Sequence, residues 1–347
     1  MRHLASIQKI NSITPIEGAD RIELVHVLGW QCVANKGQFN EGDLTVYFEV
    51  DSFLPIRDEF EFLRASSFKH SELLGDGFKL RTQKFRGALS QGLVLPVSIL
   101  GDIKVAEGDD VTEMLGVREW EEPVRASGNG TIIGGLPSFI SKTDETRIQS
   151  MPELLNEFAG LEYYITTKMD GTSCSVGLDD AGVFRITGHN TELKFDNDSA
   201  FARYLMDKHV EEKLKDFVAT HPGTLNISVQ GEFCGEGIQK NRLKLQRPEW
   251  YVFTISINGK RIPFRDMRDM VVDMGLTMVP VEEVDKDLPS IYPTIEALLK
   301  RAEGAYPNGG PKEGIVIRPT VPVYSNCLST NLSMKVINNK YLLKHDS

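Results

Sequence analysis

The chain has 347 residues, of which 41% are hydrophobic and 25% are charged, and its formal net charge is −10. A chain of this length commonly divides into two domains, and it lacks the run of about 18 apolar residues that a membrane-spanning helix needs. The acidic balance argues against a protein that coats nucleic acid over its whole surface. It leaves room for a local basic groove, and it also suits metal-assisted chemistry on phosphates.

Cysteine usage and the first residues bear on the compartment. The cysteines are scattered without a CxxC pair, which indicates reduced thiols, not a disulfide framework or a zinc site: Cys32, Cys174, Cys234 and Cys327. The opening segment MRHLASIQKI lacks the apolar core of a signal peptide. We therefore expect an intracellular protein, cytoplasmic and without membrane attachment, and by default a monomer.

Residues 1–120 are predicted to be rich in β-strands. The runs GWQCVAN, DLTVYFEV, GFKLRTQKF and GLVLPVSIL favour β structure and are separated by Gly, Asn and Asp turns. Several short strands at this spacing predict a small β-barrel of the OB-fold type. The segment DEFEFLRASSF is more typical of a helical or irregular insertion.

The rest of the chain is predicted to form a linker and an α+β domain. Residues 121–137, EEPVRASGNGTIIGGLP, are rich in Gly and Pro and have few periodic apolar positions, as in a linker. In residues 138–347 the expected strands are EYYITTK, CSVGL, FRITGH, LNISVQGEF, WYVFTISI, GIVIRP and SMKVI. The segment SAFARYLMDKHVEEKLKDFVATHPG predicts one long helix, and RDMRDMVVDMGL and PTIEALLKRAEGA predict two more.

A lysine stands where the β pattern does not favour one, in the stretch TTKMDGTSCSVG. Lys168 and Asp170 share one face of a strand, because side chains alternate, and Gly171 lets the chain turn. A free lysine, with a pKa of about 10.4, is protonated at neutral pH, so a reactive one needs burial or a nearby cation. The pair makes chemical sense if Asp170 serves a metal ion while Lys168 attacks phosphorus. The alternative is a surface hairpin with an incidental ion pair.

Three later residues change the balance between these interpretations. Glu232 ends an apolar strand in SVQGEFCGEG, Glu313 precedes an apolar strand in PKEGIVIRP, and Lys335 lies beside a strand in NLSMKVINNKYLLK. A carboxylate at the mouth of a buried strand is costly unless it is paired or near a metal ion. Each residue alone could cap a strand, but the whole ordered set is far less expected by chance.

The ordered set resembles nucleotidyltransferase motifs I, III, IIIa, IV and V of ATP-dependent ligases and mRNA capping enzymes. The matching positions are Lys168-Met169-Asp170-Gly171, Glu232, Phe253 in WYVFTI, Glu313-Gly314 and Lys335. Further segments resemble RNA ligases of the Deinococcus/Naegleria type: LPSFISKTDETRIQ, GEGIQKNRLKL, INNKYLLK, PIEGADRIELVHVLGW, GDLTVYFEVDSFLP and LRTQKFRGALSQGLVLP. The resemblance covers nearly the whole chain. It implies an α+β protein in which an N-terminal β-barrel (OB-fold) module precedes a nucleotidyltransferase domain of the ATP-grasp-like ligase type.

The same resemblance implies a role for each matching residue. Lys168 would attack the α-phosphorus of ATP, expel pyrophosphate and become lysyl-AMP, which would pass AMP to a 5′-phosphate on RNA before a 3′-hydroxyl seals the strand. Carboxylates would orient waters on Mg²⁺ or Mn²⁺: Asp170, Glu232 and Glu313. ATP contacts would come from Arg147 in TDETRIQ, Asn190, Glu232 at the ribose, Phe253 on the adenine and Lys335 at the α-phosphate.

Two positions depart from the family pattern. Such ligases usually read Ser-Arg-Asn after motif I, whereas this chain has Gly188-His189-Asn190, and histidine offers a shorter and largely neutral contact at pH 7. Motif V often reads Lys-x-Lys, and here Ser333 stands at the first lysine position. Either change could slow a step or alter the preferred substrate. His189 stays a possible RNA contact, with a tolerated surface variant as the alternative.

The N-terminal module is expected to contact RNA, because little chain follows motif V. Its aromatic residues could stack bases on an OB surface, but we favour the interpretation that most of them fill the barrel core: Trp30, Phe39, Tyr47, Phe48 and Phe53. Basic residues of one later segment are the better candidates for RNA phosphates: Arg81, Lys84 and Arg86.

These patterns together predict an ATP-dependent RNA ligase. The expected partner is RNA or an RNA/DNA duplex with 3′-hydroxyl and 5′-phosphate ends, in which the enzyme seals nicks or breaks. Two alternatives stay open at this point. One is a non-catalytic RNA-binding protein on a degenerate ligase scaffold, and the other is a ligase that joins DNA.

Overall fold

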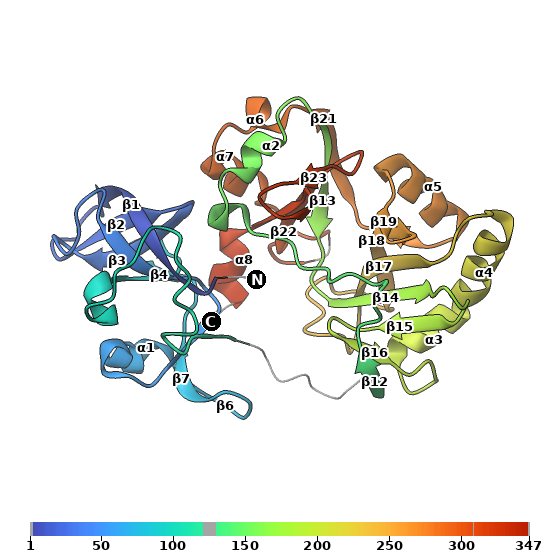
Figure 1. Cartoon of the computed structure of the whole chain (residues 1–347), viewed down its shortest axis with the longest axis horizontal. Coiled ribbons are helices and arrows are strands. Elements are labelled where there is room, and N and C mark those ends of the chain that lie inside the picture. The colour runs from blue at the N-terminus through green and yellow to red at the C-terminus, as the bar shows by residue number, and fades with distance from the viewer. Residues whose placement is uncertain (1–2, 121–129, 308, 346–347) are drawn as a thin grey trace. The chain divides into compact units, whose positions relative to one another are not determined.

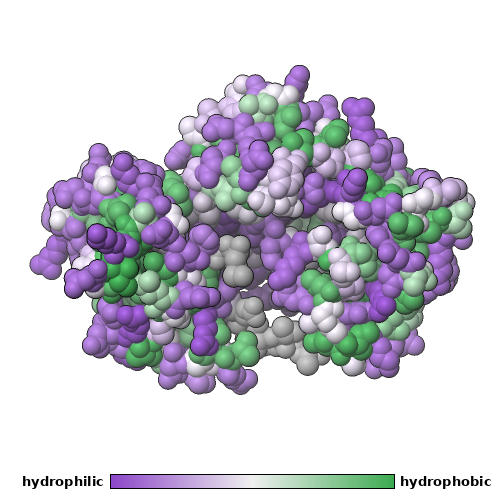
Figure 2. All heavy atoms as spheres, viewed as in Figure 1, coloured by the Kyte–Doolittle hydropathy of each residue, from purple (hydrophilic) through white to green (hydrophobic). Residues whose placement is uncertain are grey.

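The structure, a computed structural model, describes residues 3–120, 130–307 and 309–345. Its chain divides into two compact units (Figure 1). The first contains Met1–Val124, Gln149–Pro152 and Leu342–Ser347, and the second contains Arg125–Ile148 and Glu153–Tyr341. Hydrophilic side chains cover most of the visible surface of each unit, as Figure 2 shows. No helix in the described ranges has both the length and the apolar character that crossing a membrane requires.

The first unit is built mainly from short strands, as its sequence pattern predicts. The strands are β1 (Ala5–Pro15), β2 (Ile22–Val27), β3 (Trp30–Asn35), β4 (Leu44–Phe48), β5 (Ser52–Pro55), β6 (Phe68–Ser71), β7 (Gly75–Lys79), β8 (Gln83–Phe85), β9 (Ala88–Ser90), β10 (Leu93–Pro96) and β11 (Arg118–Glu119). The helical elements are η1 (Asp58–Leu63), α1 (Arg64–Ser67) and η2 (Val97–Leu100). The segment DEFEFLRASSF is thus helical, as one of its two interpretations held. GFKLRTQKF, predicted as one strand, is divided between β7 and β8.

Strand β1 organises the sheets of this unit. Its first half pairs with β4 and its second half with β2, and the register shifts between Ile10 and Ser12. Such an irregularity bends a strand, which a curved sheet requires. The strand orders are β10-β4-β1-β2-β3 in one sheet, β11-β5-β7-β6 in a second and β8-β9 in a hairpin.

Aromatic side chains fill the core of the first unit. The residues considered for base stacking are each at most 6% exposed: Trp30, Phe39, Tyr47, Phe48 and Phe53. The interpretation that most of them fill the barrel core is therefore confirmed. Stacking on nucleic-acid bases by these five rings is excluded in this structure, because their faces are covered by protein.

The second unit contains all the strands predicted for it. Its strands are β12 (Ile132–Gly135), β13 (Glu162–Lys168), β14 (Thr172–Leu178), β15 (Phe184–Thr187), β16 (Thr191–Leu193), β17 (Ile227–Cys234), β18 (Glu249–Ile257), β19 (Lys260–Arg261), β20 (Thr277–Met278), β21 (Val281–Lys286), β22 (Gly314–Pro319), β23 (Tyr324–Ser325), β24 (Thr330–Asn331) and β25 (Met334–Ile337). The helices are η3 (Ile148–Ser150), α2 (Leu154–Glu157), α3 (Ala200–Asp207), α4 (Val210–Thr220), α5 (Phe264–Asp273), α6 (Leu288–Ile291), α7 (Ile295–Arg301) and α8 (Asn339–His345). Two of these helical elements, η3 and α8, lie partly or mainly in segments of the first unit.

Two sheets carry the second unit. One has eight strands in the order β12-β16-β15-β14-β17-β18-β19, with β20 paired to β18, and the other has four in the order β21-β13-β22-β25. Strands β23 and β24 form a separate pair. Helices α3, α4 and α5 pack on the larger sheet through a shared core that includes Phe201, Leu214, Trp250 and Met267.

Two sequence expectations differ from this structure. The predicted long helix is divided into α3 and α4, because His209 adopts φ 54° and ψ 41°, the left-handed region that interrupts a helix. Apolar residues on both sides of the break pack into one core, so the helical periodicity of the sequence continues across the break and does not reveal it. Of the predicted linker 121–137, residues 121–129 lie outside the described residues, whereas Ile132–Gly135 form β12 and pair with β16.

Candidate active site

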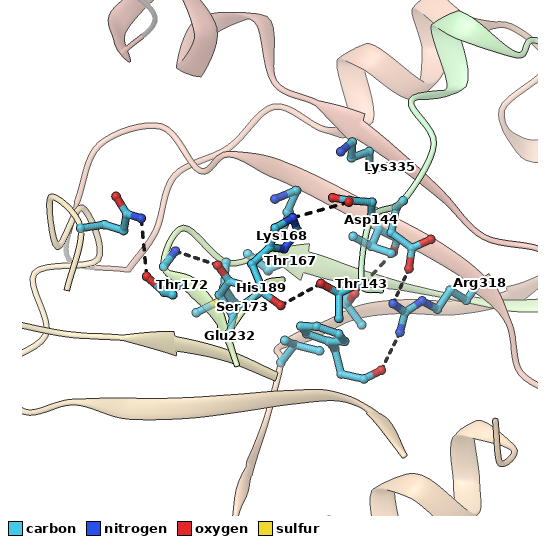
Figure 3. Close-up of a pocket in the computed structure, with 18 residues that line it drawn as sticks. Thr143, Asp144, Thr167, Lys168, Thr172, Ser173, His189, Glu232, Arg318 and Lys335 are labelled. Carbon is cyan, nitrogen blue, oxygen red and sulfur yellow. Dashed lines mark hydrogen bonds and ion pairs between the residues drawn. The ribbon is translucent and has the colours of Figure 1, made fainter. Parts of the chain in front are cut away.

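A cavity of about 370 Å³ in the second unit is lined by residues of both sheets (Figure 3). Predicted site residues from distant parts of the chain meet in its lining: Lys168, His189, Glu232, Phe253 and Lys335. They come from the end of β13, the turn before β16, and strands β17, β18 and β25. The surface-hairpin interpretation of the lysine is therefore wrong.

Gly171 explains the Lys-x-Asp-Gly spacing. A Cβ at this position would lie 2.4 Å from the carbonyl oxygen of Phe233 and 2.6 Å from Cys234 Sγ, so only glycine fits. Because the backbone approaches β17 this closely, the Gly171 N–H donates to Glu232 Oε1 at 3.1 Å. The glycine thereby joins the segment that carries Lys168 to the strand that carries Glu232.

Lys168 forms an ion pair inside the cavity region. Its Nζ lies 2.8 Å from Glu313 Oε1, and its Cα is the register partner of Gly314 in the β13–β22 pair. Burial alone would lower the pKa of Lys168, but the charges of Glu313 and Glu232 outweigh burial and raise that pKa. A raised pKa favours the ammonium form of Lys168 at neutral pH. The sequence suggested that burial or a nearby cation could lower the pKa of this lysine. Burial does not suffice here, so a reactive amine needs a nearby cation.

The three predicted metal carboxylates differ in their surroundings. Burial raises the pKa of Glu232 to about 8, with Glu313 and Asp170 acting in the same direction and Lys168 against it. Asp170 Oδ2 accepts from Arg242 Nη1 at 2.5 Å and from the Tyr341 hydroxyl at 3.0 Å.

This donor set fits a divalent cation held through waters. Carboxylate oxygens are ligands that Mg²⁺ and Mn²⁺ prefer, and positive charge would offset the like charges that raise the Glu232 pKa. Within the described residues, no three His, Cys, Asp or Glu side chains are grouped closely enough to hold a metal ion directly.

Lys335 supplies a second amine in the lining. Burial lowers its pKa to about 8, and the charges of Lys168 and Arg147 act in the same direction. The backbone N–H of Lys335 donates to the Thr146 carbonyl at 2.8 Å, and an isolated bridge pairs the backbone of Arg147 with that of Lys335. Backbone pairing therefore places the predicted triphosphate contact, Arg147, beside the lysine of motif V.

Phe253 is backed by a buried ion pair that sequence reasoning missed. The Arg318 guanidinium lies 5.5 Å from the centre of the Phe253 ring and donates to the Phe253 carbonyl at 2.5 Å. Arg318 also pairs with Glu145. Burial would raise the pKa of Glu145, but Arg318 and Arg261 lower it to about 2. The Ser333 hydroxyl donates to the same carboxylate.

The β15–β16 turn brings one of its two candidates to the cavity. His189 lines the cavity, with Nε2 3.6 Å from Asp144 Oδ2 (Figure 3). Asn190 is exposed in the same turn and is not among the lining residues.

The predicted RNA contacts of the N-terminal module belong to the first unit. Arg81 is partly buried and donates to the Ser66 carbonyl at 3.4 Å. Lys84 in β8 and Arg86 in the β8–β9 turn are exposed. The structure thus leaves the two cations of this hairpin accessible to solvent.

Several further residues of the site carried only weak sequence signals. Arg318 is a charged residue inside the apolar run GIVIRP, a pattern that could have identified it. Arg242 and Glu145 lie in segments that resemble the RNA ligases, but no local pattern assigned either residue a role. Tyr306 carried no signal, although its hydroxyl donates to the Lys168 carbonyl at 2.8 Å.

Comparison with known proteins gives matches over nearly the whole chain. An OB-fold domain model matches residues 4–97, and an RNA ligase model matches residues 161–337. Among solved structures, the Naegleria gruberi RNA ligase with PPi is 34% identical at a TM-score of 0.87, and the match covers 100% of this chain and 99% of that chain. No curated protein matched.

Two variants of the Naegleria gruberi enzyme add information on ligands. One was solved with AMP and Mn and the other with ATP and Mn. Each is 33% identical at a TM-score of 0.87, and each match covers 99% of both chains. The predicted fold class, an N-terminal OB-fold followed by an α+β nucleotidyltransferase domain, is confirmed by these matches.

Proposed function

The chain belongs to the RNA ligase family, and we propose that it is an ATP-dependent RNA ligase that acts through lysyl-AMP on Lys168. One observation carries the proposal: the Lys168 amine lies 2.8 Å from Glu313, in a cavity whose lining includes Glu232, Phe253 and Lys335. Together these side chains offer a nucleophile, oxygens for a cation and a ring for a base. The similar Naegleria gruberi enzyme was solved with ATP, with AMP and with PPi, in separate structures.

ATP is positioned by residues of both sheets in this proposal. The adenine stacks on Phe253, whose ring is backed by Arg318. Glu232 accepts from the ribose hydroxyls, and Lys335 with Arg147 contacts the phosphates. Asn190, exposed in the β15–β16 turn and outside the cavity lining, contacts the part of the nucleotide that extends beyond the lining.

The first chemical step is nucleotidyl transfer to the lysine. The Lys168 ammonium gives up a proton, and Glu313 Oε1 is an acceptor within hydrogen-bond reach at 2.8 Å. The free amine attacks the α-phosphorus, a nitrogen–phosphorus bond forms, and the bond to pyrophosphate breaks. A divalent ion, Mg²⁺ or Mn²⁺, bound through waters by Asp170, Glu232 and Glu313, would lower the amine pKa and offset charge on the phosphate oxygens.

Two further transfers complete the sealing reaction. A 5′-phosphate oxygen of RNA attacks the phosphorus of lysyl-AMP and releases Lys168. The 3′-hydroxyl then attacks the RNA 5′-phosphate and displaces AMP. We propose that the enzyme acts as a monomer on nicks or breaks in RNA or RNA/DNA duplexes, with phosphate contacts from Arg81, Lys84, Arg86 and His189.

Labelled ATP tests the assignment of the nucleophile. Wild-type protein incubated with α-labelled ATP and Mn²⁺ or Mg²⁺ should carry label on a denaturing gel, and Lys168→Ala should carry none. Lys335→Ala should reduce the label without abolishing it, because Lys335 contacts phosphate and is not the nucleophile.

The outcomes separate this proposal from its rivals. Label that persists in Lys168→Ala would disprove the nucleophile. An unlabelled wild type under varied metal and pH would support the RNA-binding protein on a degenerate scaffold. Nicked duplexes with RNA or DNA on the 3′-hydroxyl side then distinguish an RNA ligase from a DNA ligase, because an RNA ligase should require the ribose 2′-hydroxyl or A-form shape there.

A further inference from the structure

The connection between β17 and β18 has an unusual backbone. Residues 235–248 contain three non-glycine residues in the left-handed region, with φ of 47° at Gln239, 40° at Asn241 and 54° at Lys244. Such conformations are costly for residues with a Cβ and persist only where the surroundings enforce them. Concentrated strain of this kind is typical of segments with a functional role.

Internal hydrogen bonds fix the conformation of this loop. Asn241 Nδ2 donates to the Leu245 carbonyl at 2.9 Å, and its Oδ1 accepts from the Leu245 N–H at 3.0 Å. The Lys244 N–H donates to the Asn241 carbonyl at 2.9 Å, and the Asn241 N–H donates to the Ile238 carbonyl at 3.2 Å. The loop is therefore a built element and not an unsupported excursion.

Two side chains anchor the loop to the catalytic segment. Arg242 Nη1 lies 2.5 Å from Asp170 Oδ2, within the Lys-x-Asp-Gly motif. Leu243 is 5% exposed and packs in a cluster that contains Met169 and Tyr306. A third contact joins the loop to the cavity, where Gln239 Nε2 lies 3.5 Å from Thr172 Oγ1 and both residues belong to the lining.

The loop is basic in a protein that is acidic overall. Its segment 235–248 contains four basic residues and one acidic residue, Glu236, whereas the whole chain has a net charge of −10. Arg242 is used internally, but Lys240, Lys244 and Arg247 are exposed. In the described parts of the chain none of these three cations has an ion-pair partner. A rigid loop at the cavity edge thus holds cations toward solvent.

We infer that this loop is an RNA phosphate-binding element, in which Lys240, Lys244 and Arg247 hold the strand whose end enters the cavity. The inference rests on the proposed function, because it concerns the RNA of the second and third transfers. Lysyl-AMP formation uses ATP and no RNA. The loop therefore serves the steps that bind the polynucleotide and not lysyl-AMP formation. Cations on a fixed backbone align a phosphate chain without reading its sequence.

The test removes the loop's exposed charges together and compares an equal change elsewhere. The variant is Lys240→Gln, Lys244→Gln, Arg247→Gln. The matched control is Lys260→Gln, Lys286→Gln, Lys300→Gln, three exposed lysines of the same unit in other elements. Three measurements are made on each protein: labelled lysyl-AMP without RNA, affinity for a nicked RNA duplex by fluorescence anisotropy, and sealing of that duplex with its 5′ end already adenylylated.

We expect the loop variant to form lysyl-AMP as the wild type does, and to lose affinity and sub-saturating sealing on the order of tenfold. The slope of log affinity against log salt should become shallower by about 1 for each RNA phosphate that the variant no longer neutralises. The control should keep all three properties. Unchanged affinity and salt slope in the loop variant, or an equal loss in the control, would overturn the inference. A wild type that binds RNA through the loop but forms no lysyl-AMP would instead overturn the proposed function.

Discussion

Ser333 stands where similar ligases often carry a lysine, and its surroundings show what it does instead. The side chain is buried, with 5% of the residue exposed, and its hydroxyl donates to Glu145. Glu145 in turn pairs with Arg318, which lies against Phe253. The serine is therefore part of the support of the proposed adenine-stacking ring. It is not simply a cation missing from the phosphate end of the cavity.

Restoring the family residue at this position should harm the enzyme. In Ser333→Lys a buried ammonium would compete with Arg318 for Glu145 and overfill the site, at a cost of about 1–3 kcal/mol in unfolding free energy. We expect a lower Tm and a several-fold higher KM for ATP in lysyl-AMP formation. Ser333→Ala, which removes only the donor, should show a smaller change in both. A Ser333→Lys enzyme that forms lysyl-AMP faster than wild type at equal KM would contradict this role.

Strands β13 and β22 position the ion pair of Lys168 and Glu313, because the pairing of these strands ends beside the two residues. Lys168 and Gly314 are the last register partners. Beyond them the Tyr306 hydroxyl bridges the two strands, donating to the Lys168 carbonyl at 2.8 Å and accepting from the Glu313 N–H at 3.1 Å. Tyr306 is 4% exposed, so no bulk water replaces this bridge. One hydroxyl thus sets the spacing of the two residues that form the central ion pair.

Removing that hydroxyl should slow nucleotidyl transfer. Tyr306→Phe keeps the ring but leaves a buried carbonyl and N–H without their partner, at a cost of about 1–3 kcal/mol. Because small misplacement of a nucleophile is expensive, we expect the rate of lysyl-AMP formation at saturating ATP to fall roughly tenfold. The matched control is Tyr292→Phe, which loses a 2.8 Å bond to Glu283 without touching the site. Similar rate losses in both variants would show that general destabilisation, not positioning, is responsible.

The strands were predictable because they depend on local patterns. Runs such as EYYITTK and GIVIRP alternate or concentrate apolar residues over a few positions, and each forms the expected strand. The break between α3 and α4 was not predictable in this way. It depends on one residue, His209, that adopts a left-handed conformation while the apolar periodicity continues on both sides.

The motif residues of the site could be predicted from the sequence, but the residues that hold them in place could not. Lys168, Glu232 and Lys335 lie in ordered motifs and were identified by their resemblance to the ligase motifs. Arg318 and Tyr306 act through contacts set by strand register and loop closure, which no short window of sequence contains. The direction of the Lys168 pKa shift was also beyond a short window of sequence, because it depends on the balance between burial and the charges of Glu313 and Glu232, which come from distant parts of the chain.

For the molecule as a whole, burying the charged forms of Glu232 and Lys335 lowers the free energy of unfolding. Glu232 is held where burial raises its pKa to about 8, and Lys335 where burial lowers its pKa to about 8. Both groups are therefore less stable in their charged form in the folded protein than in the unfolded chain. A bound cation or nucleotide that favours the charged forms would bind the folded state selectively and stabilise it.

This conflict predicts how stability depends on pH in the metal-free protein. The ordinary pKa of the Glu232 carboxyl is 4.5 and its folded value is about 8, so between these limits the folded state holds more protons than the unfolded state. Stability contributed by this group therefore falls as pH rises through that window. Glu232→Gln cannot lose a proton, and its amide oxygen can still accept from Gly171. Relative to wild type, the variant should gain Tm steadily from about pH 5 to pH 8.

Thermal unfolding in EDTA at pH 5, 6, 7 and 8 measures this gain. Since about 1 kcal/mol moves Tm by roughly 2–4 °C in a domain of this size, we expect a difference of a few degrees at pH 8 and little or none at pH 5. Glu236→Gln makes the same chemical change at an exposed position of the neighbouring loop and serves as the matched control. A Tm difference that is equal at every pH would mean that the amide improves packing and that Glu232 is not held at a raised pKa. A difference that shrinks toward pH 8 would reverse the sign and show that the folded site favours the carboxylate even without a cation.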